Sequence, residues 1–433
     1  MMRHLSQQHA VTLVSFVRVD DRPEYVEHLA QFCRAVHTVP MVRSTARNLR
    51  AGLKGLLTGL PMVIARDDTP AMTALLRRLV QETPFDLIHA DQLSMAAWAQ
   101  LAAKAAPTDQ ITPTTHPPST RDDSFAPFAL RALRAPSRVR GPNAPRLLLD
   151  EHNAIYKLTE RMAAESQGLR RWITQREARA FRRYEADMVR RFDAILTVSN
   201  EDRGLLLDLF AEPERSQQAA KFTTIPICVD PTTQTMIDER GMMNAETPPD
   251  SAFIVHPSSF RPPTILHLGT MFWPPNVAGV LWFAREVLPL IWQQAPEARF
   301  VVVGKNPPPE VQALAADPRI EVTGYVADPQ PYLQATGVFV VPLHSGGGMR
   351  VKILDAWLWG LPIVSTPIGA EGIELVDGEN ILLAADAASF ADAALRLLTD
   401  AALNQRLRLA GRRWVEQRYA WQVVYRRVDA LLG

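Results

Sequence analysis

A glycine-rich turn followed by two cations and a carboxylate is the stretch of this sequence best suited to chemistry. In VFVVPLHSGGGMRVKILDAWLWG, the glycines Gly346–Gly348 end an apolar run, and Arg350, Lys352 and Asp355 follow. Glycines let backbone N–H groups approach a ligand closely, and the amino end of the helix that follows favours a phosphate. The two cations suit a diphosphate leaving group, and Asp355 is placed to accept hydrogen bonds from ribose hydroxyls.

Two other loops of the same half also follow apolar runs. The segment ILHLGTMFWPPN places Gly269 and Asn276 after one run, and LPIVSTPIGAEGIELVDGEN places Glu371 and Gly372 after another. Ligands of open α/β sheets bind at the carboxyl ends of parallel strands, so we expect the three loops to form one donor-binding site. Each feature alone also fits a simpler role, such as tight packing of a glycine turn or a solvated surface charge.

The first half offers fewer candidates. His152 ends the run RLLLDEHN, so we expect it at the carboxyl end of a strand, facing an interdomain cleft. Asn153 follows it, and Asp91 follows the run FDLIHA in the same way. The alternative for His152 is a capping or core histidine.

Short apolar runs rich in Val and Ile alternate with helical stretches along the whole chain. Such near-continuous runs suit strands that are covered on both faces, and strand–helix alternation predicts doubly wound parallel sheets. The predicted strands are Val11–Val17, Phe85–Ala90, Arg146–His152, Phe192–Ser199, Phe222–Val229, Thr264–Leu268, Arg299–Gly304, Ile320–Tyr325, Val338–Leu343, Leu361–Ser365 and Ile381–Ala384.

The pattern predicts two Rossmann-like α/β domains. We expect the first over residues 1–235, with a Pro-rich insertion at 106–145 that holds eight prolines, and a polar linker over 236–261. The second is expected over 262–418, with a terminal helix at 419–433 that packs back toward the first domain. A composition so rich in Pro, Thr, Ser and Arg cannot bury a core.

Composition excludes several classes of protein. Lys and Arg total 47 against 46 for Asp and Glu, so nucleic-acid binding is not expected. The two cysteines, Cys33 and Cys228, offer neither a disulfide framework nor a metal cluster, which suits the cytoplasm. No apolar run is long enough for a membrane-spanning helix.

The second half resembles the donor domain of glycosyltransferase family 4, the retaining GT-B enzymes. The resemblance rests on HLGTM…PPN, FVVVGKNPP, VTGYVADPQPYL, VVPLHSGGGMRVKILDAWLWGLPIVSTPIGAEGI and DGENILL. It implies a GT-B fold, a nucleotide diphosphate sugar as donor, a hydroxyl acceptor, no cofactor and no metal. The family's two glutamates, eight positions apart, fall on Gly347 and Asp355, so the first of them is missing here.

The first half resembles the acceptor domain of the same family through RHLSQQHAVTLVSFV, FDLIHADQLSMA, RLLLDEHNAIYKL and FDAILTVSNEDR. The resemblance implies that His152 lies beside the transferred sugar and that Asp91 and Asn153 lie on the acceptor side. Family members begin with a further strand and a glycine loop, which are absent, so we expect a truncated amino end. The alternatives to a glycosyltransferase are an inactive GT-B-like scaffold and a sugar-nucleotide epimerase.

Basic stretches in the first half also predict contact with a membrane. Arg161–Arg191 carries nine arginines against four acids, and Pro40–Ala65 carries only basic charges. These stretches suit an anionic membrane surface that bears a lipid-linked acceptor, as in polysaccharide assembly at the inner face of the membrane. The alternative is a solvated helix face.

Overall fold

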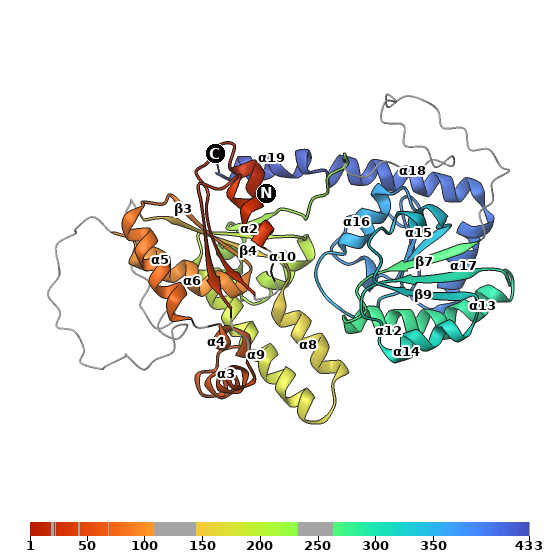
Figure 1. Cartoon of the computed structure of the whole chain (residues 1–433), viewed down its shortest axis with the longest axis horizontal. Helices are drawn as coiled ribbons and strands as arrows, with labels where there is room; N and C mark the ends of the chain where they lie inside the picture. The colour runs from red at the N-terminus through yellow and green to blue at the C-terminus, as the bar shows by residue number, and fades with distance from the viewer. Residues whose placement is uncertain are drawn as a thin grey trace. The chain divides into compact units, whose positions relative to one another are not determined.

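The computed structural model describes residues 1–18, 21, 23–41, 44–67, 69–107, 144–232 and 263–432. It divides into two compact units (Figure 1). The N-terminal unit is Met1–Thr197 with Asp202–Thr224, and the C-terminal unit is Val198–Glu201 with Ile225–Gly433. The predicted linker and almost all of the predicted Pro-rich insertion lie outside the described residues.

The N-terminal unit holds two parallel sheets, one of two strands in the order β1-β2 and one of four in the order β3-β4-β5-β6. Its elements are α1 Met2–Leu5, β1 Thr12–Val17, α2 Pro23–Ala30, β2 Ala35–Pro40, α3 Thr45–Thr58, α4 Met62–Arg66, α5 Pro70–Glu82, β3 Leu87–Asp91, α6 Ala96–Ala105, β4 Arg146–Glu151, α8 Ile155–Glu165, α9 Gly168–Arg191, β5 Ala194–Thr197, α10 Asn200–Leu207, α11 Glu214–Ala219 and β6 Phe222–Thr224.

The C-terminal unit holds one parallel sheet of six strands in the order β12-β11-β10-β7-β8-β9. Its elements are β7 Thr264–Leu268, α12 Pro274–Trp282, α13 Leu288–Trp292, β8 Arg299–Val303, α14 Pro309–Gln312, β9 Ile320–Gly324, α15 Gln330–Ala335, β10 Val338–Val341, α16 Val351–Leu358, β11 Ile363–Ser365, β12 Leu382–Leu383, α17 Ala387–Thr399, α18 Ala401–Arg418 and α19 Trp421–Leu432.

The order of the six strands creates a switch point at the centre of this sheet. From β7 the chain moves outward through β8 to β9, then returns to β10 on the other side of β7 and moves outward again. The loops that leave β7 and β10 therefore diverge to opposite faces, which opens a crevice at the carboxyl edge. Of the sequence-predicted donor residues, Gly269 and Gly346–Gly348 lie on those two loops, and Asn276 and Asp355 lie on the helices that follow them. Glu371 and Gly372 lie on the loop that leaves β11.

Both faces of the six-stranded sheet are buried, which explains the near-continuous apolar runs. On β8, Phe300 and Val302 belong to one core, and Val301 and Val303 belong to the other, because successive side chains point to opposite faces. In Figure 1, α12, α13 and α14 cover one face and α15 and α16 cover the other.

In the N-terminal unit, the four-stranded sheet forms a core with α9. Leu147, Leu149 and Ile195 are buried against Phe181 and Tyr184 of that helix. The two-stranded sheet packs separately, with Val39 of β2 against Met72 of α5 and Trp98 of α6.

Every strand predicted from the sequence overlaps an observed one, and the prediction of parallel α/β sheets is confirmed. The strand β2 was missed. Its sequence AVHTVP is short and mixed, and only Val39 is buried within it, so its apolar signal is weak. Within the described residues, no helix combines the length and apolar character that a bilayer crossing requires.

Candidate functional site

The three loops predicted to bind a donor converge at the switch point of the six-stranded sheet. The ammonium Nζ of Lys352 donates a hydrogen bond to Oδ1 of Asn276 at 2.9 Å, and Nδ2 of Asn276 donates to the Thr270 carbonyl at 2.9 Å. A Cβ atom added to Gly269 would stand 2.8 Å from Nζ of Lys352 and 2.7 Å from Nδ2 of Asn276. Gly269 is therefore a position where a side chain would displace the lysine.

The ammonium group of Lys352 loses its proton more readily than that of an ordinary lysine. Burial first, and then the neighbouring positive charge of Arg350, together lower the pKa of its ammonium to about 7. An ammonium with little water around it interacts strongly with an incoming anion, because the local dielectric is low. A bound diphosphate would restore the ordinary pKa of this group, so the site favours anionic ligands.

Arg350, predicted to offset the charge of a diphosphate, is held by contacts within the loops of the site. Its side chain is only 5% exposed, and the guanidinium donates to the carbonyls of Gly347, Gly348 and Ile368. It also lies 4.0 Å from a carboxylate oxygen of Glu371. Arg350 thus joins the glycine loop to the turn at 368–371, and its contacts are those of a residue that shapes the site.

The glycine loop has the backbone that only glycine adopts readily. Gly346 and Gly348 have φ values of 119° and 76°, in the region that disfavours other residues. Gly372 has a φ of 82°, and a Cβ there would stand 2.9 Å from the Cα of Met349. The second and third predicted loops are therefore in contact. Helix α16 begins directly after the glycine loop, at Val351.

Asp355 lies half-buried on α16, one turn after Lys352. Burial raises the pKa of its carboxyl. A partly desolvated carboxylate gains more from a hydrogen-bond donor than one in water does, which suits the role predicted for it with ribose hydroxyls.

Asp355→Ala should weaken binding of a nucleoside diphosphate by roughly tenfold to a hundredfold, because a charge-assisted hydrogen bond is lost. Isothermal titration with UDP and GDP would measure the affinities. Asp392→Ala, on an exposed position of α17, is the matched control and should leave them unchanged. Equal affinities for Asp355→Ala and the wild type would remove Asp355 from the site.

His267 is a buried neighbour of this site that sequence reasoning missed. Its ring is 0% exposed, and burial followed by the charge of Lys352 moves its pKa well below the usual value. Nδ1 lies 3.0 Å from the Val340 carbonyl, which can only accept, so Nδ1 carries the proton. Its signal was a lone histidine inside the apolar run ILHLG, which sequence alone does not separate from a core histidine.

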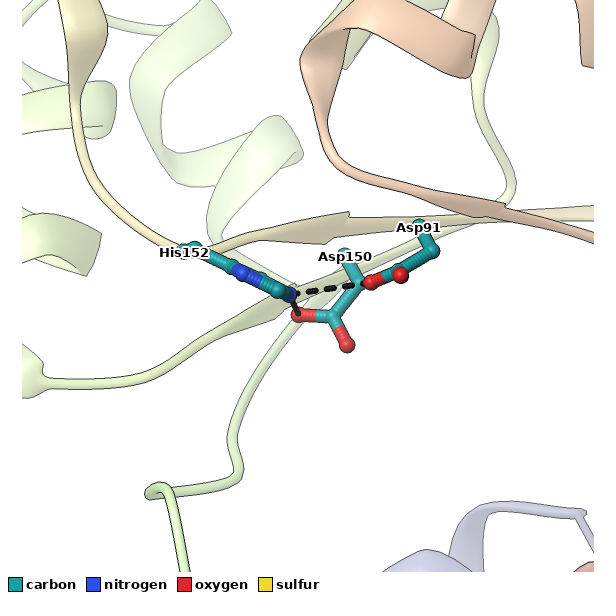
Figure 2. A group of neighbouring side chains, drawn as sticks. All are labelled: Asp91, Asp150 and His152. Atoms are coloured by element: carbon teal, nitrogen blue, oxygen red, sulfur yellow. Dashed lines mark ion pairs between the residues drawn. The ribbon is translucent and has the colours of Figure 1, made fainter. Parts of the chain in front are cut away.

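The N-terminal unit brings Asp91, Asp150 and His152 together (Figure 2). Asp91 and Asp150 are directly paired residues of β3 and β4, and His152 follows β4 with its side chain on the same side as Asp150. Nε2 of His152 lies 3.0 Å from Oδ1 of Asp91 and 3.8 Å from Oδ1 of Asp150. Asn153 is half-buried beside them, before α8 begins.

The electrostatics of this cluster favour a protonated His152 and an ionised Asp91. The hydrogen bond from His152 lowers the pKa of the Asp91 carboxyl, and the bond to Asp91, with the charge of Asp150, raises the pKa of the His152 imidazole. One ligand atom from each of the three lies within 4.8 Å of the others, so they are also a group that could hold a metal ion.

Two buried carboxylates hold the turn that follows His152. Glu185 of α9 accepts hydrogen bonds from the amides of Ile155 and Tyr156 at 2.6 and 3.1 Å. Asp202 of α10 accepts from the amide of Ala154 at 3.0 Å. Three successive amides at the start of α8 are thus satisfied by acids from two other helices, which fixes the chain next to the histidine.

The C-terminal unit also matches a known sequence family. Residues 262–400 match the family model described as glycosyl transferases group 1. The matched segment includes Gly269, Asn276, Lys352 and Asp355, so the cluster at the switch point lies within it.

Curated relatives match shorter parts of the chain. An uncharacterized 44.6 kDa protein in the cps region of Klebsiella pneumoniae is 29% identical over 135 residues, which cover 29% of this chain and 35% of that protein. Phosphatidyl-myo-inositol mannosyltransferase of Mycobacterium leprae is 28% identical over 167 residues, 37% of this chain and 44% of that one. The matched segments thus span less than half the length of these two relatives.

Solved structures resemble the whole chain. Anabaena HepE in complex with UDP and glucose covers 98% of this chain and 99% of its own, with a TM-score of 0.59 and 12% identity. Sucrose-phosphate synthase of Thermosynechococcus elongatus covers 100% and 90%, with a TM-score of 0.59 and 15% identity. At these identities the likeness shows the fold, which is GT-B as predicted.

Proposed function

We propose that this protein transfers a sugar from a nucleotide diphosphate sugar to a hydroxyl group and retains the configuration of the anomeric carbon. The observation that carries the proposal is the contact of Lys352 with Asn276 and Gly269 at the switch point of a parallel sheet. Support also comes from the match to glycosyl transferases group 1 and from relatives named for mannosyl transfer to phosphatidyl-myo-inositol and for capsular polysaccharide biosynthesis. The acceptor we propose is therefore a glycolipid or a cell-surface polysaccharide.

The C-terminal unit would bind the donor and stabilise the departing diphosphate. As the glycosidic bond breaks, the sugar gains oxocarbenium character and negative charge builds on the diphosphate. Lys352 and the amides of Gly346–Gly348 would offset that charge, which is a preorganised electrostatic role. Arg350 would keep the loop in place, and Asp355 would hold the ribose.

The N-terminal unit would supply the acceptor side. His152, whose pKa is raised by its hydrogen bond to Asp91, would donate a hydrogen bond to a sugar hydroxyl and orient the ring. The carboxylate of Asp91 would accept hydrogen bonds from hydroxyl groups of the acceptor substrate. The side-chain amide of Asn153 could both donate hydrogen bonds to these groups and accept them. We propose no proton transfer by His152, because a retaining transfer does not require a general base of the inverting kind.

The proposal is tested first by binding and then by turnover. Titration of the purified protein with UDP and GDP identifies the nucleotide, and the matching nucleotide sugars are then incubated with polysaccharide and glycolipid acceptors. The product should keep the donor's anomeric configuration, as read from its proton NMR coupling constant. Binding without transfer to any acceptor would favour an inactive scaffold, inversion would overturn the retaining mechanism, and conversion of the donor into an epimer would indicate an epimerase.

EDTA should leave the transfer rate unchanged, because Lys352 and backbone amides would supply the charge that a divalent metal supplies in other transferases. The rate would be measured before and after chelation, with added Mg²⁺ and Zn²⁺ as further conditions. A rate that falls with EDTA and returns with a metal would contradict this prediction, and it would direct attention to Asp91, Asp150 and His152.

A further inference from the structure

Helix α3 is oriented with its large apolar side chains toward solvent. Four leucines recur at helical spacing along one side, and all are exposed: Leu49 by 78%, Leu53 by 60%, Leu56 by 48% and Leu57 by 80%. Such a face is unusual on a protein surface, where contiguous apolar patches mark interaction sites.

The opposite side of α3 carries small residues and packs inward. Ala51 is only 4% exposed, and Gly55 is buried, with its carbonyl accepting a hydrogen bond from Arg176 of α9. A Cβ on Gly55 would stand 3.1 Å from the Leu60 carbonyl. The helix is therefore held to the protein by its small-residue side, and the leucines are left outward by the packing itself.

The charged residues of the segment that contains this leucine face are all basic. The whole segment 40–65 contains basic residues and no Asp or Glu, and exposed Arg50 lies on α3 beside the leucines. A partner protein with a basic or neutral rim would gain nothing from this charge, whereas an anionic lipid surface attracts each cation near it.

A second exposed segment on the same unit has the same chemistry. At the start of α9, Leu169 is 73% and Trp172 is 55% exposed, and Arg170 and Arg171 between them are exposed as well. Figure 1 shows α3 and the hairpin of α8 and α9 at the same lower end of the N-terminal unit. Tryptophan beside arginine is the composition of a membrane–water interface.

We propose that the leucine face of α3, with Leu169 and Trp172 of α9, docks the N-terminal unit onto an anionic lipid bilayer. The leucines would enter the boundary between headgroups and acyl chains, and the arginines would pair with lipid phosphates. This inference rests on the surface of α3 and α9, so it stands or fails independently of sugar transfer.

Sedimentation of the full chain with vesicles tests the proposal. We expect binding to vesicles of equal parts phosphatidylcholine and phosphatidylglycerol, much weaker binding to phosphatidylcholine alone, and loss of binding in high salt. Leu53→Gln with Leu57→Gln should lower the partition coefficient at least about tenfold, because two leucines no longer enter the bilayer. Arg50→Gln should lower it about fivefold.

A matched pair of changes on the C-terminal unit serves as the control. Tyr325→Gln with Val376→Gln removes two exposed apolar side chains there and should leave vesicle binding unchanged. Equal thermal unfolding of all variants would show that the fold is kept. The proposal would be overturned if the wild-type protein did not bind anionic vesicles, or if the leucine variant bound them as well as the wild type does. A wild-type dimer that the leucine variant dissociates, seen by light scattering, would assign the face to a second copy instead.

Discussion

Lys352→Met should make the C-terminal unit more stable and the enzyme far slower. Below pH 7 the buried ammonium is charged in both states, and its folded pKa of about 7 lies well under the unfolded value of about 10.4. The unfolded state binds more protons between these values, so this lysine costs stability at neutral pH, and its cost shrinks as the pH rises. Removing it should raise the free energy of unfolding by about 1–3 kcal/mol.

The same change should lower kcat by about 10²–10³-fold, because the charge that offsets the departing diphosphate is lost. Urea unfolding and steady-state transfer assays would measure the two effects. Lys305→Met, at an exposed position after β8, is the control and should change neither. Full activity of Lys352→Met would remove this residue from the mechanism that we propose.

The pH profile gives an independent check on Lys352. Only its protonated form can offset negative charge, so kcat/KM, which reports the free enzyme, should fall as the pH rises through about 7. In the donor complex the diphosphate raises the pKa of Lys352, so kcat should hold to higher pH. A kcat/KM that is flat from pH 6 to 9 would argue against a titrating lysine.

The sequence was enough to predict the fold and the meeting of Gly269, Asn276 and Lys352. Apolar Val and Ile runs predicted the strands, and the loops after parallel strands share one edge of a sheet, so residues far apart in sequence could be placed together. The contacts of Arg350 could not be predicted in this way. The direction of its side chain depends on which carbonyls the glycine loop presents, and no spacing rule encodes that.

The cluster on the N-terminal unit depends on register, which sequence does not reveal. Asp91 and His152 were predicted separately, but their contact requires β3 and β4 to pair with Asp91 opposite Asp150. A shift by one residue would turn these side chains to opposite faces. The outward leucines of α3 were likewise hidden, because an amphipathic pattern does not tell which face is buried when small residues line the other side.

The N-terminal unit should lose stability as the pH rises from 5 to 8, and Glu185→Gln should remove part of that loss. Burial raises the pKa of Glu185 to about 8, against the pull of the Tyr156 and Ile155 amides, and the charge of Asp202 adds to the rise. A raised folded pKa means that the folded state binds more protons than the unfolded state between about pH 4.3 and pH 8. Unfolding free energy therefore falls through that window, by roughly 2–4 kcal/mol.

Hydrogen exchange at the start of α8 would measure this effect, because the amides of Ile155 and Tyr156 donate to Glu185. After correction for intrinsic rates, their protection should fall with pH in the wild type and fall less steeply in Glu185→Gln. The glutamine oxygen still accepts from one of the two amides, its NH₂ group cannot accept from the other, and the side chain never ionises. Glu82→Gln, at an exposed position of α5, should behave as the wild type. Glu151 is only 1% exposed, and burial first, and then the charge of Glu185, raise the pKa of its carboxyl well above normal. The pKa of Glu151 should therefore lose part of that rise in Glu185→Gln. An equal slope in wild type and Glu185→Gln would show that Glu185 is not the group that titrates.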